Sequence, residues 1–264
     1  MSNRLFFPTA FAACMLLASC GPHLYPVPRN PITEPSVLLN RLDEHAGRFN
    51  RLSAVARLSS KSEQGSVRGR ITVLADIGGR LRVDGWTPTD SLVATLTAGP
   101  EDFHYFERGA GECLTGRSCP ENLALLLPVG MEVRPTVGFL FGIPPIRPAP
   151  DWTMSFDRRS GAYELVSRIR GGDWQRVWIR EDGIPVAAEF IEDEKLVFRM
   201  NASDFRKVSG RVFPMKVSLH ATREDSSLTI KYRSVDLDPV IRDEDWDFTC
   251  PEGMGLRVVH CRDE

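Results

Sequence analysis

The sequence predicts a mainly β domain with a few helices, built on an antiparallel sheet. Short runs of alternating apolar and polar residues recur through most of the chain, and turn-forming residues separate them at hairpin spacing. One helical insertion interrupts these runs midway. The chain shows neither the βαβ alternation of a parallel sheet nor a repeat of fixed period, which excludes those two architectures.

Residues 1–19 have the layout of a secretory signal peptide. The basic residue Arg4 precedes a mostly apolar run from Leu5 to Leu17, which is too short for a membrane span of about 20 residues. The stretch Leu17-Ala18-Ser19-Cys20 resembles a bacterial lipobox, whose cysteine is acylated and becomes the new N-terminus. We therefore expect Cys20 to carry a diacyl group on sulfur and an acyl chain such as palmitate on its amine, which gives durable anchoring. The alternative is an ordinary signal peptide with a chance cysteine.

Residues 20–35 are predicted to form a lipidated, proline-rich tether, and residues 36–264 a single domain. The tether contains five prolines and little periodicity, as is typical of an extended, semi-rigid spacer. Gly21 follows the lipidated cysteine in place of the aspartate commonly read as an inner-membrane retention signal. We expect the protein to lie on the periplasmic face of the outer membrane, attached through its lipid.

The first half of the domain is predicted to contain one helix and then a β-meander. A helix fits Ser36 to about Phe49, where apolar residues recur at helical spacing and Ser36 can cap the first turn. The period then changes to two, so that one face of the sheet is apolar and the other polar. The predicted strands are Ser53–Ser60, Val67–Val73, Arg80–Val83, Leu92–Leu96 and Phe103–Tyr105.

The helical insertion and a second series of strands follow. Helices are predicted over Glu121–Leu127 and Met131–Phe141, and their apolar sides need a sheet face or a barrel mouth as a partner. About eleven strands are expected in the whole domain. Those of the second half are Trp152–Phe156, Ala162–Ile169, Trp174–Arg180, Val186–Ile191, Leu196–Met200, Val212–Ala221 and Ser227–Val235.

Four cysteines remain in the domain, which is an even set for a protein expected in an oxidising compartment. Local pairing of Cys113 with Cys119 and of Cys250 with Cys261 is the simplest of the three connectivities. The second bond would close a terminal hairpin between a strand ending at Cys250 and a short returning strand at residues 256–259. Zinc is a weaker alternative, because the spacing does not match a zinc site.

Composition and motifs argue against several functions. Lysine and arginine (33) nearly balance aspartate and glutamate (35), whereas a nucleic-acid-binding protein would carry a basic excess. The sequence lacks a Gly-x-Ser-x-Gly elbow, a His-Glu-x-x-His zinc helix and a phosphate-binding glycine loop. Acidic clusters at 193–194 and 243–245 leave calcium as a minor alternative. We expect no cofactor and assign no catalytic residue. Enzymatic activity is a third alternative, after the two binding functions given at the end of this subsection.

Several short strings resemble the lipoprotein-localisation family, that is, the periplasmic lipoprotein carrier and its outer-membrane receptor. They include Arg80-Leu81-Arg82-Val83, the turn Thr87–Asp90 and the segment Phe139–Pro144 that closes the helices. The ending, Phe248 with Pro251-Glu252-Gly253, is similar to that of the carrier. The resemblance implies a half-barrel: one strongly curved antiparallel sheet whose apolar concave side is lidded by the N-terminal helix and the insertion.

The same resemblance breaks at one functional position. The receptor carries an exposed leucine in the turn that matches Thr87–Asp90, and this chain has Thr89 there. Trp86, just before the turn, is a candidate to replace that apolar contact with membrane or cargo. The alternative for Trp86 is a buried aromatic at the end of a strand.

The predicted function is acyl-chain binding. Apolar side chains exceed what one curved sheet with two or three helices needs, although any one of them could belong to a sealed core. We expect an outer-membrane lipoprotein that binds the acyl chains of lipoproteins or lipids, with a periplasmic carrier as a candidate partner. The competing hypothesis is a structural or sensor lipoprotein that recognises an envelope protein. The candidate acyl-binding residues are Leu81, Val83, Leu96, Phe103, Leu126, Phe139, Phe141, Trp178 and Phe198.

Overall fold

The computed structural model describes residues 24–63, 65–125, 127, 131–169, 172–222 and 225–261. The signal peptide, Cys20 and Leu126 lie outside this set, so lipidation and the role of Leu126 stay predictions. All helices and strands of the described residues lie between Pro35 and Val259.

In the described part of the chain, fourteen strands form one open, curved sheet. Their order across the sheet is β14-β6-β5-β4-β3-β2-β1-β13-β12-β11-β10-β9-β8-β7. The strands are β1 Arg51–Ser62, β2 Gly65–Asp76, β3 Arg80–Trp86, β4 Leu92–Ala98, β5 Asp102–Glu107, β6 Glu112–Arg117, β7 Trp152–Asp157, β8 Ala162–Arg168, β9 Trp174–Ile179, β10 Pro185–Glu192, β11 Lys195–Val208, β12 Arg211–Ala221, β13 Ser226–Leu237 and β14 Gly255–Val259.

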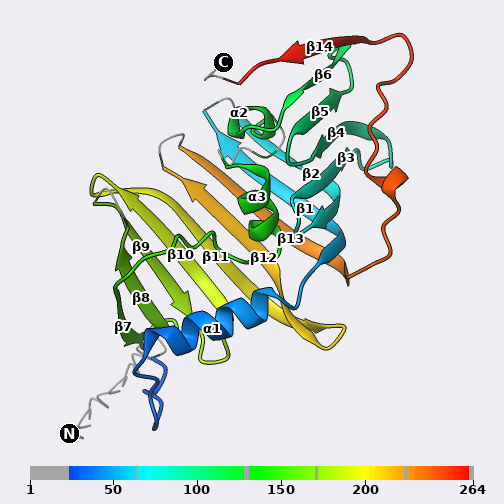
Figure 1. Ribbon diagram of the computed structural model, residues 1–264. Helices are drawn as coiled ribbons and strands as arrows, with labels where there is room; N and C mark the ends of the chain where they lie inside the picture. Colours follow the sequence, from blue (N-terminus) through cyan, green and yellow to red (C-terminus); the bar gives the residue numbers. More distant parts are fainter. Residues whose placement is uncertain are drawn as a thin grey trace, which may run out of the picture.

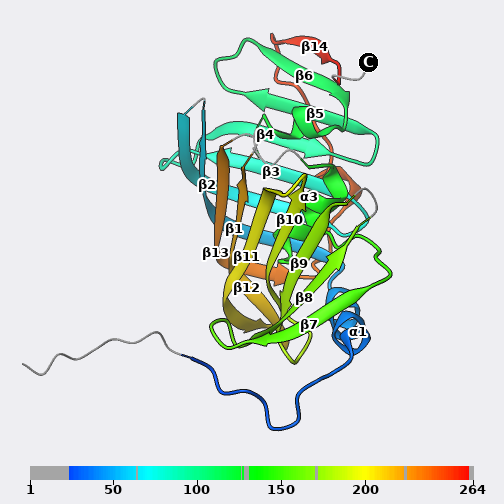
Figure 2. The same cartoon turned by 90° about the vertical axis from the view of Figure 1, so that its left-hand side faces the viewer.

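The chain builds this sheet outward from its middle (Figure 1). It begins at β1, forms the wing β2–β6, crosses to the far edge at β7 and returns through β8–β13 to pair β13 with β1. These ladders are antiparallel, as alternation and hairpin spacing predict. The last strand, β14, instead pairs in parallel with β6 at the edge of the first wing. Figure 2 shows that the strands of the two wings run at a large angle to each other, so the sheet is strongly curved.

The sheet has fourteen strands in the described residues, whereas about eleven were predicted. The two strands without a counterpart in the predicted series, β6 and β14, lie together at one edge of the sheet. β6 has the sequence Glu-Cys-Leu-Thr-Gly-Arg, which shows little apolar alternation. β14 was expected to return as half of a terminal hairpin, but it extends the sheet beside β6.

Three α-helices are present in the described residues, and each is shorter than predicted. They are α1 Pro35–Ala46, α2 Pro120–Leu123 and α3 Val133–Leu140. Proline occupies the first turn of α1, where its missing N–H has no helical partner to lose, so the helix begins before Ser36. Phe49 follows the end of α1 and is nevertheless buried in the core.

The inner face of the sheet holds the core, and α3 lies within its curve (Figure 1). The Tyr232 hydroxyl on β13 donates to the carbonyl of Leu140 on α3 at 2.7 Å, which ties that helix to the middle of the sheet. α1 lies along one end of the second wing, where Arg41 Nη1 donates to the carbonyl of Glu181 at 2.6 Å. The largest fully buried side chains include Tyr163, Phe49, Phe103, Phe139, Phe141 and Phe213.

Candidate functional site

Most of the predicted acyl-binding residues lie together, but in a sealed core. Each of them is at most 1 % exposed, and they belong to one continuous hydrophobic cluster. The sheet residues face inward from β3, β4 and β5, and the two phenylalanines come from α3 and its C-terminal end. Packing of α3 against the sheet therefore fills the space that an acyl chain was expected to occupy. These residues are Leu81, Val83, Leu96, Phe103, Phe139 and Phe141.

Two of the other candidates differ in position. Trp178 was wrongly placed on the concave side: it alternates with the buried residues Val177 and Ile179 and therefore lies on the outer face. There the guanidinium of Arg176 stands 5.8 Å from its ring centroid. Phe198 on β11 is partly buried and packs against the core, with its ring stacked on that of Phe190 at a centroid distance of 4.4 Å.

An open cleft lies beside this core, at the end of the first wing on its inner face. Its volume is about 610 Å³. The floor is formed by Leu58, Ile71, Ala94 and Tyr105, all buried members of the same hydrophobic cluster. One wall comes from the segment that follows α2, including Leu125. The floor of the cleft is therefore the apolar outer layer of the core.

The rim of the inner-face cleft combines exposed apolar residues with charged ones. Val67 and Leu125 are 59 % and 46 % exposed, although both are large and apolar. The phenol of Tyr105 donates to Glu107 at 3.1 Å, and burial together with the Glu107 charge raises the pKa of Tyr105. That hydroxyl is therefore neutral at physiological pH. Arg68, Arg70 and Arg108 are the cationic residues of the lining.

Trp86 lies at the end of β3, lines this cleft and is half-buried. Its indole Nε1 donates to Thr72 Oγ1 at 3.1 Å, and Arg70 stands 5.7 Å from its ring centroid. Trp86 is therefore neither fully buried nor free of packing, and its contact with membrane or cargo stays a prediction. The turn beyond it exposes Pro88, Thr89 and Asp90.

Solved structures share this architecture. No family model and no curated protein sequence matches the chain. A DUF1329 family protein from Desulfovibrio piger aligns with TM-score 0.53 and 13% identity, over 80% of this chain and 94% of the other. A putative outer membrane lipoprotein-sorting protein domain from Vibrio parahaemolyticus aligns with TM-score 0.54 and 10% identity, over 79% and 95%. A LolA superfamily protein from Nitrosomonas europaea aligns with TM-score 0.50 and 13% identity, over 82% and 98%.

The chain has a LolA-like fold. The resemblance to the lipoprotein-localisation family is thereby confirmed for the curved sheet and its helices, and identities this low show the fold alone.

The C-terminal segment is an addition to the predicted half-barrel, and the predicted local cysteine pairing is wrong. Cys113 is bonded to Cys250 and Cys119 to Cys261, with Cα–Cα distances of 6.1 and 6.2 Å. Both bonds join the region of β6 and α2 to the segment that carries β14. Gly116 faces Val259 in this parallel pair, and a methyl group at Gly116 would overlap the Val259 carbonyl oxygen.

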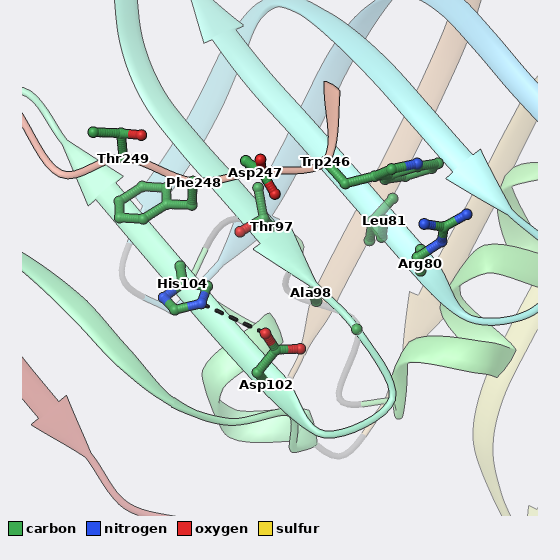
Figure 3. A pocket seen from close by; sticks show the side chains of 11 residues that line it. Arg80, Leu81, Thr97, Ala98, Asp102, His104, Trp246, Asp247, Phe248 and Thr249 are labelled. Carbon is green, nitrogen blue, oxygen red and sulfur yellow. Dashed lines mark ion pairs between the residues drawn. The ribbon is translucent and has the colours of Figure 1, made fainter. Parts of the chain in front are cut away.

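Before it reaches β14, the C-terminal segment crosses the outer face of the first wing (Figure 3). A hollow of about 450 Å³ lies beneath it. Arg80 stands 4.7 Å from the ring centroid of Trp246, and the rings of His104 and Phe248 stack at 5.3 Å. Asp102 Oδ2 lies 3.6 Å from His104 Nε2. These contacts hold residues 246–249 against the sheet, where a hairpin strand was predicted.

The described residues include neither a candidate metal-binding group nor a helix that could cross a membrane. No group of three or more histidine, cysteine, aspartate or glutamate side chains is arranged to hold a metal ion among them. None of the helices in these parts of the chain has the length and apolar character to cross a membrane.

Proposed function

We propose that this protein is a lipid-anchored, non-enzymatic binding protein of the outer membrane that holds acyl chains of lipoproteins or lipids in the inner-face cleft. The observation that carries the proposal is a solvent-open cleft whose floor is continuous with the core. Its volume of about 610 Å³ lies within the range of roughly 300–1,000 Å³ for small-molecule sites. Each methylene moved from water into such a cleft contributes about 0.8 kcal/mol, so binding needs no reactive group.

The surroundings of the cleft support the same proposal. Val67 and Leu125 place apolar surface at the opening, where the end of a chain would first make contact. Leu123 and Leu127 flank Leu125 in sequence and are fully buried, so the segment after α2 covers the core from the side of the cleft.

The proposed cellular role is lipoprotein sorting or outer-membrane assembly, with a periplasmic carrier protein as a candidate partner. The LolA-like fold and the fold shared with a putative lipoprotein-sorting domain support this role. The lipobox-like Cys20 and the Gly21 that follows it support the outer-membrane address.

Binding of a fluorescent fatty acid to a chain that begins at Gly21 tests the proposal. This shortened chain contains every helix and strand of the described residues. Val67→Ser with Leu125→Ser should weaken binding about tenfold, because about 1.4 kcal/mol of apolar contact is lost. Val258→Ser is the matched control, since Val258 is 60 % exposed and lies on β14, away from the cleft.

Three outcomes are informative. Weaker binding by the double variant, with unchanged binding by the control, supports acyl binding in the inner-face cleft. Equal loss in both variants would show that the probe adsorbs to exposed apolar surface in general. No saturable binding to the unmodified chain would end the acyl-binding proposal.

The alternative function, recognition of an envelope protein, is favoured by one observation. β14 is an edge strand on which Leu256 and Val258 are 63 % and 60 % exposed. An unpaired edge with apolar side chains can accept a strand from another protein. Retention of a partner protein from an envelope extract, lost in Leu256→Ser, would favour this role, and retention that ignores Leu256 would contradict it.

A further inference from the structure

A second hollow lies on the outer face of the sheet, and its lining is strongly cationic. We call it the arginine hollow; its volume is about 450 Å³. It is lined by Arg57 on β1, Arg68 and Arg70 on β2, and Arg233 on β13, together with the end of β3. Arginine and lysine do not exceed acidic residues in the chain as a whole, so this cluster does not follow from composition.

The register of the sheet concentrates the charge further. Lys216, Lys231, Arg57 and Arg70 stand directly opposite one another on the four adjacent strands β12, β13, β1 and β2. Like charges placed opposite each other across strands destabilise a sheet. The row therefore costs stability unless an anion lies against it.

The protein itself supplies little neutralising charge. Asp90 pairs with Arg70 at 2.5 Å, but the Asp90 side chain is 72 % exposed, and such surface pairs contribute little. Within the described residues, Arg57, Arg68 and Arg233 make no ion pair with an acidic side chain. Arg70 Nε is in addition buried without a hydrogen-bond partner. Guanidinium groups arranged in this way favour phosphate, which they bind through paired N–H donors.

The arginine hollow adjoins the inner-face cleft around a free strand edge. The ladder between β2 and β3 begins at Arg70, opposite Trp86, so β2 has no neighbour on that side over residues 65–69. Gly69 lies at this edge and carries no side chain to separate the two sites. Both sites share Arg68, Gly69, Arg70 and Trp86 in their linings.

We propose that the arginine hollow binds the phosphate group of a lipid whose acyl chain lies in the inner-face cleft. The inference rests on the proposed function and narrows its ligand to a phosphate-bearing lipid. An acidic protein segment would neutralise the arginines, but it would bring no acyl chain to fill the adjoining apolar cleft. The same holds for a free phosphate ion.

Two short-chain lipids with identical acyl chains test the inference: dioctanoyl phosphatidic acid and dioctanoylglycerol. The chain from Gly21 should bind phosphatidic acid at least tenfold more tightly at low salt. The preference should shrink as salt increases, because added ions screen the arginines. Arg57→Gln with Arg233→Gln should reduce it to about twofold and leave dioctanoylglycerol affinity unchanged.

A matched variant separates this site from a general charge effect. Lys195→Gln with Lys207→Gln removes two exposed cations from the ends of β11, outside the hollow, and should keep the full preference. The melting temperature of the arginine variant should equal or exceed that of the unmodified chain, because repulsion within the cationic row is relieved. A lower melting temperature would assign Arg57 and Arg233 a structural role and overturn the inference.

The remaining outcomes distinguish this inference from the proposed function. Equal affinity for both lipids would overturn the phosphate site and leave acyl binding intact. Failure to bind either lipid would overturn both the phosphate site and the proposed acyl binding. Tight binding of inorganic phosphate, or of a poly-glutamate peptide, at affinities that match phosphatidic acid would overturn the lipid assignment in favour of a free anion or an acidic protein.

Discussion

Removal of the Cys119–Cys261 disulfide should release β14 from the sheet and leave the rest of the domain folded. The bond Cys113–Cys250 would still hold the start of the segment, so the second bond closes a loop of only about 15–20 residues. The chain-entropy model gives about 3 kcal/mol for a loop of this length. β14 has five residue pairs with β6, and four of its five residues are exposed. Burial in the core therefore contributes little to holding β14 in place once the disulfide is removed.

Hydrogen exchange followed by mass spectrometry measures this release. In Cys119→Ser with Cys261→Ser, amides of residues 255–259 should exchange up to about 100-fold faster, as 3 kcal/mol corresponds to two decades. Amides of β1 and β12 should keep their rates, because the C-terminal strand adds no residue to the main hydrophobic cluster except the partly buried Val259. Unchanged exchange at β14, or faster exchange throughout the sheet, would refute this reasoning.

Three further predictions concern α1 and the tether. Gly183→Ala should lower the free energy of unfolding, measured by chemical denaturation, by roughly 1–3 kcal/mol, since φ is +83° and the new methyl would lie 2.5 Å from a backbone oxygen of α1. Gly210→Ala is the control: its φ is +79° but the space around it is open, so it measures the backbone strain without the clash. Burial, followed by nearby arginines, lowers the pKa of His45 below 6.5. The unfolded chain therefore binds the proton more readily, so stability should decline as pH falls below about 6.5, and His45→Gln should flatten that decline. Cys20→Ser should abolish acylation and leave the chain uncleaved or mis-sorted in fractionated cells; a processed protein that still partitions into detergent would contradict the lipobox.

Alternation in the sequence was sufficient to predict most strands and the direction of their side chains. Leu81, Val83 and Leu96 were expected on the concave face and lie there, because each stands two residues from another apolar residue of its strand. Trp178 was included for its size rather than its position in the alternation, and it lies on the other face.

Long-range pairing was beyond what local patterns could show. The sequence indicated four disulfide cysteines, but which ones meet depends on where the chain crosses the sheet after β13. The same crossing sets the parallel pairing of β14, which no hairpin signal predicts.

The open site was missed for a related reason. The residues chosen for their apolar character are those that packing seals, whereas the cleft forms where β3 ends and leaves the edge of β2 uncovered. Its rim residues Val67 and Leu125 could have been singled out only from their exposure in the folded protein.

Photocrosslinking with a diazirine-labelled fatty acid tests the central claim most directly. The chain from Gly21 is incubated with the probe, irradiated and digested, and the labelled residues are located by mass spectrometry. We expect labels on residues that line the inner-face cleft, among them Leu58, Ile71, Ala94, Tyr105 and Leu125, and competition by unlabelled fatty acid. Labels confined to β14, to the outer face or to no fixed position would contradict acyl binding in this cleft.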